Sequence, residues 1–373
     1  MSINGNKMAL PGLEYQFVNW RDGMKITQKH LALHDNAIRD AIRDSAAVFI
    51  NGHNYGLLPA EDGISSGVQI SVMGDTIRLL SCRAITPGGI RVEWDSGADQ
   101  DSVSLSLLDY KSRLGKVGIF YIVLRISLSN TIEAGEYDTE ELPLRKPHKV
   151  LKPMLELLSV HEKIADAYSI PIFRVRFEGQ LFSPDYDYIP PTTGVFGENL
   201  MWYYETCGKQ INSIHQTAVL TLRKINGMQN PSAVARDIHQ IMDKLVMSGL
   251  EVIDHYRFIS KEQPPVYFIA DLMKYARTMR IALDCLSENS LARLYQYMRN
   301  NVGGTTKFNM HVPEVTKSLM DSMIDTVLTS QYNHNDCTML LDNIKAYLDF
   351  IEFVLQSLLA LPYVEATSRW DIA

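Results

Sequence analysis

The sequence predicts an α+β protein in which an N-terminal all-β sandwich precedes a C-terminal α-helical bundle. Up to about residue 182 the hydrophobic residues recur with a period of two, and after residue 198 they recur every three or four positions. Between the two patterns lies PDYDYIPPTTG (184–194), whose adjacent prolines can continue neither a sheet ladder nor a helix. We therefore expect a β shell over 1–192, a helical bundle over 193–300, and a linker with C-terminal helices over 301–373.

Alternating apolar and polar residues place the strands of the N-terminal half. A two-sided apolar run at 117–128 is typical of a central strand, and turn residues separate the strands at the close spacing of a sandwich or jelly roll. A helix is expected only at about 27–45. The expected strands are 67–72 (GVQISV), 89–94 (GIRVEW), 102–108 (SVSLSLL), 117–128 (VGIFYIVLRISL) and 168–183 (YSIPIFRVRFEGQLFS).

The C-terminal half shows helical stripes broken by glycine and proline. Gly227 ends the first stripe, Asn230-Pro231 opens a second helix, and Pro264-Pro265 precedes a third, which SENS (287–290) can interrupt. The glycine-bearing segment 301–313 then leads to helices at 314–329 and about 338–361. We expect a bundle of four or five helices joined by short loops.

Composition excludes several classes of protein. The 373 residues are 46% hydrophobic and 21% charged, which is typical of a folded chain of about two domains. The net charge of -7, without a Lys/Arg cluster, argues against a nucleic-acid partner. No apolar run approaches the ~18 residues of a membrane span, and no signal peptide is evident, so a cytoplasmic protein without membrane insertion is expected. Its four scattered cysteines are typical of reduced thiols.

Motifs for nucleotide binding, serine nucleophiles and zinc proteases are absent from the sequence. VGGTTK (302–307) has the wrong spacing for a phosphate loop. HNDC (334–337) lies between two helices, where His, Asn and Asp are common cap and turn residues. We therefore expect no catalytic residue and no cofactor.

One stretch, WRDGMKITQKHLALHD (20–35), holds a possible metal site. His30 and His34 lie one helical turn apart, as zinc ligands often do, and Asp35 could orient them. No third ligand stands at a matching spacing, and the flanking Trp20, Gly23 and Met24 suggest an aromatic anchor and a tight turn. We expect structural histidines, no metal, and a buried Trp20 ring whose removal costs roughly 3 to 5 kcal/mol. A metal-dependent β-barrel enzyme using His30 and His34 remains the alternative.

A block within residues 20–35 and a second block within residues 169–191 resemble the signatures of the TssK family, a baseplate component of the bacterial type VI secretion system. The second block comprises SIPIFRV (169–175) and DYIPP (187–191), and it lies before the helices as in that family. Gln28, Leu31 and Ala32 depart from the residues common there, which suggests a divergent branch. The matching residues are Trp20, Asp22, Gly23, Met24 and His30 in the first block, and Ile170, Pro171, Tyr188, Ile189, Pro190 and Pro191 in the second.

This resemblance implies a non-enzymatic structural protein acting through protein–protein interaction in a contractile injection system. TssK-like proteins are homotrimers whose β shell, similar to the shoulder of phage receptor-binding proteins, attaches to the TssF/TssG wedge, while the C-terminal end reaches toward the inner-membrane complex. We therefore expect a cytoplasmic adaptor docked at the inner membrane through partners. The family's β-rich head is expected to be missing or replaced, since the ~60 residues after the linker read as helical. A phage-like tail receptor-binding protein is the second hypothesis.

Two features are candidates for contacts with other chains. A stripe on the first long helix can be either an internal seam or the contact around a threefold axis. Trp370, near the C-terminus, can pack on its own bundle or anchor in a partner's pocket. The stripe comprises Ile211, Ile214, Ala218, Leu222 and Ile225.

Overall fold

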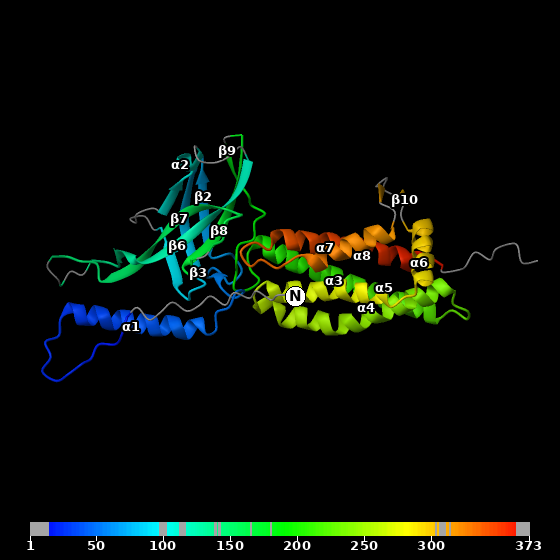
Figure 1. Cartoon of the computed structure of the whole chain (residues 1–373), viewed down its shortest axis with the longest axis horizontal. Helices are drawn as coiled ribbons and strands as arrows, with labels where there is room; N and C mark the ends of the chain where they lie inside the picture. Colours follow the sequence, from blue (N-terminus) through cyan, green and yellow to red (C-terminus); the bar gives the residue numbers. More distant parts are fainter. Residues whose placement is uncertain are drawn as a thin grey trace, which may run out of the picture. The chain divides into compact units, whose positions relative to one another are not determined.

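The computed structural model divides the chain into two compact units. The first groups Met1–Leu200 with His334–Asp336, and the second groups Met201–Asn333 with Cys337–Ala373. The residues that the structure describes are 15–96, 103–111, 117–137, 140, 143–164, 166–179, 181–302, 304–305, 311–312 and 315–362. The first unit is rich in strands and the second in helices, which confirms the predicted α+β fold (Figure 1).

The first sheet of the β unit is organised around one strand that the sequence pattern did not reveal. This strand, β3 (Thr76–Ile85), pairs antiparallel with β1 (Gly56–Leu57), β2 (Val68–Met73), β4 (Arg91–Asp95) and β5 (Val103–Ser106). Its register against β2 shifts at Gln69/Ile70, where Leu80 is the extra residue of a bulge. The bulge reverses the alternation halfway along β3, so no continuous period of two marks the strand.

The second sheet has the order β7-β6-β8-β9. Its members are β6 (Val117–Ala134), β7 (His148–Ser159), β8 (Ser169–Glu178) and β9 (Leu181–Pro184), and β6 is the central strand that its two-sided apolar run predicted. The strand β7, which carries Pro153 opposite Ile126, was not predicted from the sequence. An edge strand tolerates a proline because one side of its ladder makes no bonds within the sheet.

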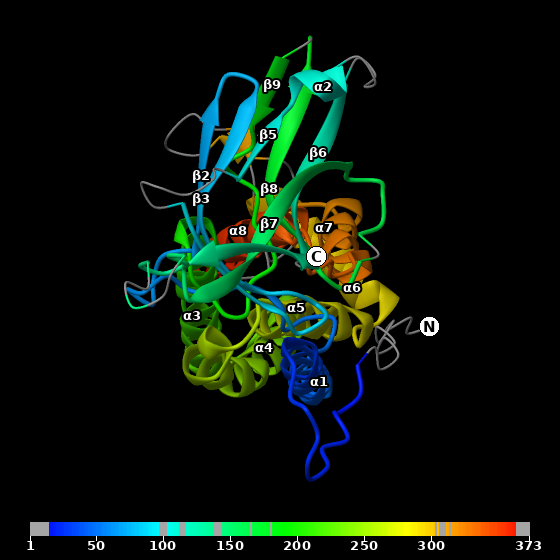
Figure 2. The ribbon, with the colours of Figure 1, turned by 90° about the vertical axis from the view of Figure 1, so that its left-hand side faces the viewer.

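The buried faces of both sheets meet in one apolar core, which includes Ile77, Leu79, Ile122, Leu124 and Phe177. In Figure 2 the strands β2 and β3 lie to one side of β6 and β8. A short helix, α2 (Leu108–Lys111), follows β5.

The long helix α1 (Gln28–Ala47) of this unit buries one face that carries charge. Ala37, Asp40 and Arg43 are buried, and Arg43 Nη1 lies 3.1 Å from Asp40 Oδ1. The amide of Tyr15 also donates to Asp40, at 3.1 Å. The buried charges of α1 are therefore paired, as burial in a low-dielectric environment requires.

The second unit is a helical bundle (Figure 1). Serine caps mark two of its helix starts, since Ser232 accepts from the amide of Ala235 and Ser287 from that of Ser290. The SENS segment therefore begins a helix. The helices are α3 (Glu198–Asn226), α4 (Ala233–Phe258), α5 (Val266–Asp284), α6 (Glu288–Asn301), α7 (Lys317–Thr329) and α8 (Thr338–Ala360), with a 3₁₀ turn at Ser260–Glu262 and a short ladder between β10 (Gly304–Thr305) and β11 (His311–Val312).

Helices α7 and α8 are members of this bundle, not an appendage on a flexible linker. Ile324 of α7 and Leu341 and Tyr347 of α8 are buried. The guanidinium of Arg280 on α5 donates to Asp321 on α7 at 2.7 Å. The sequence interpretation separated residues 314–373 at the GG segment because a pair of glycines often marks a linker. Packing of α7 and α8 with α5 shows that the bundle core extends across it.

The backbone of β1 packs closely against Pro191 of the DYIPP segment at Gly56. A substitution of Gly56 therefore tests how much this close approach matters. Gly56 has a φ of +116°, and a Cβ at this position would lie 2.2 Å from the carbonyl oxygen of Pro191. We expect Gly56→Ala to lower the free energy of unfolding by about 3 kcal/mol or more. Two costs add: the strain of a positive φ for alanine, and the steric overlap of the new Cβ with the Pro191 carbonyl. Gly63, with a φ of +70° and nothing within 4 Å of its Cβ position, is the matched control, and Gly63→Ala should cost about 1 to 2 kcal/mol. Equal losses in urea denaturation would contradict the steric argument.

Candidate functional site

The first motif block forms the entry to α1. Gly23 has a φ of +77° in a turn closed by the amide of Met24 donating to the carbonyl of Arg21. Thr27 is the N-cap residue of the helix, and its amide donates to Nδ1 of His30 at 3.3 Å. His30 therefore helps to cap the helix, which is a structural use of the imidazole.

The Trp20 ring lies edge-on to both histidines of the block. Its centroid is 6.2 Å from that of His30 and 5.8 Å from that of His34. Among the described residues, no three His, Cys, Asp or Glu side chains are grouped as metal ligands. The geometry of His30 and His34 is that of an aromatic cluster beside a helix cap.

The expectation of a buried Trp20 is wrong, because the residue is 42% exposed. Asp22 and Gly23 are exposed too, and Met24 is half-buried. Turn residues ahead of a helix face solvent on at least one side, so the tryptophan lies against the two histidines and not inside a core.

Arg174 and Tyr188 of the second motif block contribute to a polar socket, which we define as Tyr55, Tyr121, Arg174, Asp185 and Tyr188. Nε of Arg174 donates to Asp185 Oδ2 at 2.8 Å, and Nε of Arg176 donates to the same oxygen at 3.0 Å. The Arg174 guanidinium lies 5.1 Å from the centroid of the Tyr188 ring. SIPIFRV and DYIPP, separated in sequence, thus meet through Arg174.

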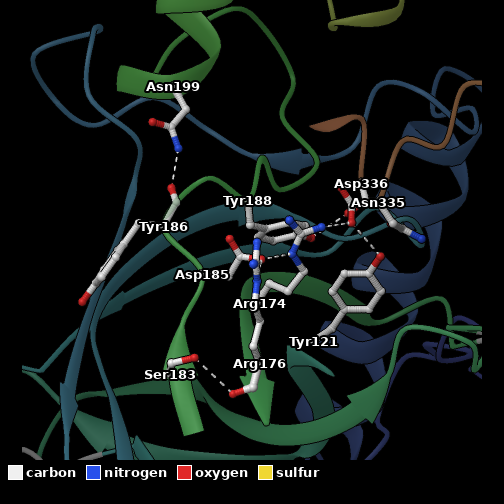
Figure 3. A network of polar contacts seen from close by, with 10 residues as sticks. All are labelled: Tyr121, Arg174, Arg176, Ser183, Asp185, Tyr186, Tyr188, Asn199, Asn335 and Asp336. Atoms are coloured by element: carbon white, nitrogen blue, oxygen red, sulfur yellow. Dashed lines mark hydrogen bonds and ion pairs between the residues drawn. The ribbon is translucent and has the colours of Figure 1, made fainter. Parts of the chain in front are cut away.

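A turn from far along the chain occupies this socket (Figure 3). Asp336 Oδ2 accepts from Nη1 of Arg174 and, at 3.0 Å, from the hydroxyl of Tyr121. The Tyr188 hydroxyl donates to the backbone carbonyl of Asn335 at 2.6 Å, and the Tyr55 hydroxyl donates to Oδ1 of Asn335 at 2.8 Å. His334 is buried, with Nε2 2.8 Å from the carbonyl of Tyr55. These residues of HNDC were predicted to be cap and turn residues, and nothing in their spacing points to the socket.

The electrostatics of the socket depend on paired charges. Burial by itself would raise the pKa of Asp185, but hydrogen bonds from Arg176 and Arg174 bring that pKa below its ordinary value. Burial and the Asp336 carboxylate raise the pKa of Tyr121. Burial lowers the pKa of His334 to about 4, so its imidazole is neutral at pH 7. The arrangement binds a segment of the chain itself through paired charges and hydrogen bonds.

The remaining residues of the second block are structural. Ile170, Pro171, Tyr188, Ile189 and Pro191 are buried, and Pro190 is half-buried. The carbonyl of Pro191 accepts from the amide of Leu57 at 2.8 Å. These residues shape the β unit from within, so they are not themselves available to a partner.

Exposed apolar side chains give each unit a candidate contact face. On and just after α1, Leu31, Ile38, Ile42 and Phe49 are 53%, 39%, 65% and 77% exposed. Their spacing of seven, four and seven residues places them on one stripe of a helix, since Val48 keeps the helical backbone conformation. On α4 of the second unit, Met247, Leu250 and Phe258 are also exposed. Solvent-facing stripes of this kind are typical of protein interfaces.

The predicted seam on α3 is internal to the bundle. Ile211, Ile214, Ala218 and Ile225 are each at most 2% exposed in the single chain, and Leu222 is half-buried. A threefold contact through these residues would require the bundle to open, so the stripe serves as the bundle's own core. Trp370 lies outside the described residues, and its role stays a prediction.

The exposure of Trp20 sets an upper limit on its contribution to stability. We expect Trp20→Ala to lower the free energy of unfolding by less than about 2 kcal/mol, because part of the ring stays in water in the folded chain. Phe177→Ala is the matched control: this ring is fully buried, and its loss should cost about 3 to 5 kcal/mol. Urea denaturation of both variants checks this, and an equal cost would show that Trp20 is buried in solution.

Within the described residues, no helix is long and apolar enough to cross a membrane. Neither a family model nor a curated protein matches the chain.

Solved structures do match. A crystal structure of TssK aligns with a TM-score of 0.55 and 14% identity, over 90% of this chain and 68% of that one. The baseplate complex from the type VI secretion system contains a chain that aligns with a TM-score of 0.53 and 13% identity, over 91% and 99%. A chain of the TssK-TssF-TssG baseplate subcomplex aligns with a TM-score of 0.50 and 13% identity, again over 91% and 99%. From the β unit through the helical bundle, this protein has the fold of the type VI secretion baseplate component TssK.

Proposed function

We propose that this chain is a divergent TssK, a non-catalytic homotrimeric adaptor of the type VI secretion baseplate that joins a TssF/TssG wedge to a membrane-side complex. The observation that carries the proposal is the likeness of fold, which extends over about nine tenths of the chain. One of the matching chains belongs to a complex of TssK with TssF and TssG. This role would place the protein in the cytoplasm, docked at the inner membrane through its partners.

The arrangement of the two signature blocks supports the proposal. Both blocks belong to the first unit, and the second block contributes to its polar socket. Arg174 of SIPIFRV packs on Tyr188 of DYIPP, so the two parts of the second block are in contact in the fold. The proposal assigns these residues a structural part in the β shell, and it assigns wedge binding to the shell surface.

The proposed trimer needs a contact surface other than the α3 seam, which is buried. We assign that contact to the α1 stripe of Leu31, Ile38, Ile42 and Phe49, with further copies of this chain as its partners. Four large apolar side chains on this stripe are exposed to water in the single chain. Their burial between copies of the chain would be favourable, so the stripe favours association. The α4 face of Met247, Leu250 and Phe258 is then available for the membrane-side partner, together with Trp370.

Copurification tests the wedge assignment. Truncation after residue 300 is unsuitable, because it would remove His334–Asp336 from the first unit and α7 and α8 from the second. We expect tagged full-length chain to retain TssF and TssG of the same organism, and Leu250→Asp to keep them while losing the membrane-side partner. A folded trimer that fails to retain TssF and TssG, when a TssK of known activity retains its own wedge in parallel, would contradict the proposal.

Light scattering after gel filtration tests the trimer contact. Ile42→Asp places a charge in the α1 stripe and should convert the trimer to a folded monomer of about the chain's 42.2 kDa mass. Ile281→Asp is the matched control, because Ile281 is 55% exposed but lies on α5 of the other unit. It should leave the trimer unchanged. If Ile42→Asp remains trimeric, the contact lies elsewhere on the chain.

A further inference from the structure

The turn between α7 and α8 belongs to the β unit although both helices belong to the bundle. Helix α7 ends at Thr329 and α8 begins at Thr338, and only His334–Asp336 of the intervening segment group with the first unit. The chain therefore enters the first unit for three residues and leaves it again. Such a short insertion contributes no strand to a sheet and no turn of a helix.

Polar contacts and the packing of the His334 ring hold this turn. The Asp336 carboxylate takes hydrogen bonds from Arg174 and Tyr121 (Figure 3). Asn335 takes them from Tyr188 and Tyr55. His334 also contacts the carbonyl of Tyr55, and its ring packs 4.7 Å from the Tyr55 ring, centroid to centroid. Polar contacts exchange readily for contacts with water, so each stabilises the closed state modestly.

The socket also keeps its own charges paired when the turn leaves. Arg174 retains Asp185, which Arg176 also neutralises. Departure of Asp336 therefore does not strand a lone buried cation, which would otherwise make opening very unfavourable. Opening breaks no helix and no sheet ladder, because residues 330–337 belong to neither.

We propose that His334–Asp336 is a latch, which closes in the socket of the β unit and opens locally while both units remain folded. Local unfolding occurs most readily in segments with little buried apolar surface, whose hydrogen bonds water can replace. The latch goes beyond the proposed baseplate role and does not depend on it. It gives the chain two states of the α7–α8 connection, one held by the β unit and one released.

The buried histidine makes the latch sensitive to pH. The groups facing it include His53 and Tyr55, and those facing Asp336 include Arg174 and Tyr121. Because the closed latch lowers the pKa of His334 from 6.5 to about 4, closure is favoured above pH 6.5 and loses this contribution as pH falls toward 4. Between pH 7.5 and 5.5 the open fraction should rise about 10-fold from this group alone.

The cysteines of the chain provide the test. Cys337, next to the latch, is buried, as are Cys82 of the β unit and Cys207 of the bundle, whereas Cys285 is exposed. In full-length Cys285→Ser protein, labelling of each thiol by 4,4′-dithiodipyridine is followed by mass spectrometry and normalised to the unfolded chain at the same pH. We expect Cys337 to react faster than Cys82 and Cys207, since these two report unfolding of their units.

Two substitutions separate a latch from a permanent part of the core. Asp336→Asn should speed labelling of Cys337 by 10-fold or more and leave the labelling rates of Cys82 and Cys207 unchanged. Asp321→Asn is the control, because it weakens an ion pair of α7 inside the bundle. It should not change the labelling rate of Cys337. His334→Gln should abolish the acceleration of Cys337 between pH 7.5 and 5.5. Labelling of Cys337 at the rate of Cys82 or of Cys207 in every variant would overturn the proposal, because the turn would then open only when a whole unit unfolds.

Discussion

The buried carboxylate of Asp185 is the interaction on which the β unit's second half depends. It lies directly after β9 and takes hydrogen bonds from Arg174 and Arg176 of β8. The pairing fixes where DYIPP leaves the sheet, so that Tyr188 packs under Arg174 and the Pro191 carbonyl reaches the amide of Leu57. A buried ion pair is costly to form and more costly to break on one side, which is why such a site fixes one geometry well.

The socket extends the same arrangement to a third segment of the chain. Arg174 has two carboxylate partners, Asp185 from the segment between β9 and DYIPP, and Asp336 from beyond α7. Tyrosines line the remaining sides, where a hydroxyl can donate a hydrogen bond while the ring packs against apolar neighbours. The residues that look most like a functional motif are therefore occupied by the protein itself, and surfaces for partners must be sought on the exposed faces of α1 and α4.

This division has a physical basis. A unique fold needs its buried polar groups to be hydrogen-bonded. Association instead needs apolar side chains that are exposed in the free chain and become buried on binding. Trp20, Leu31 and Ile42 lie on the solvent side of the first unit, and Met247 and Leu250 on that of the second. The adaptor role that we propose needs only such faces and a rigid body to carry them.

The sequence by itself determined the fold class, the strands β2, β4, β5, β6 and β8, and the long helices, because these follow from local hydrophobic period and proline placement. It did not reveal β3, whose bulge at Leu80 breaks the alternation, or β7, whose Pro153 is tolerated only at a sheet edge. Tertiary structure alone decided that the Ile211 stripe faces inward, that the Trp20 ring stays half in water, and that α7 and α8 join the bundle. It alone brought Asp336 to Arg174 across 162 residues, because a turn of three polar residues has no periodicity from which its partner could be inferred.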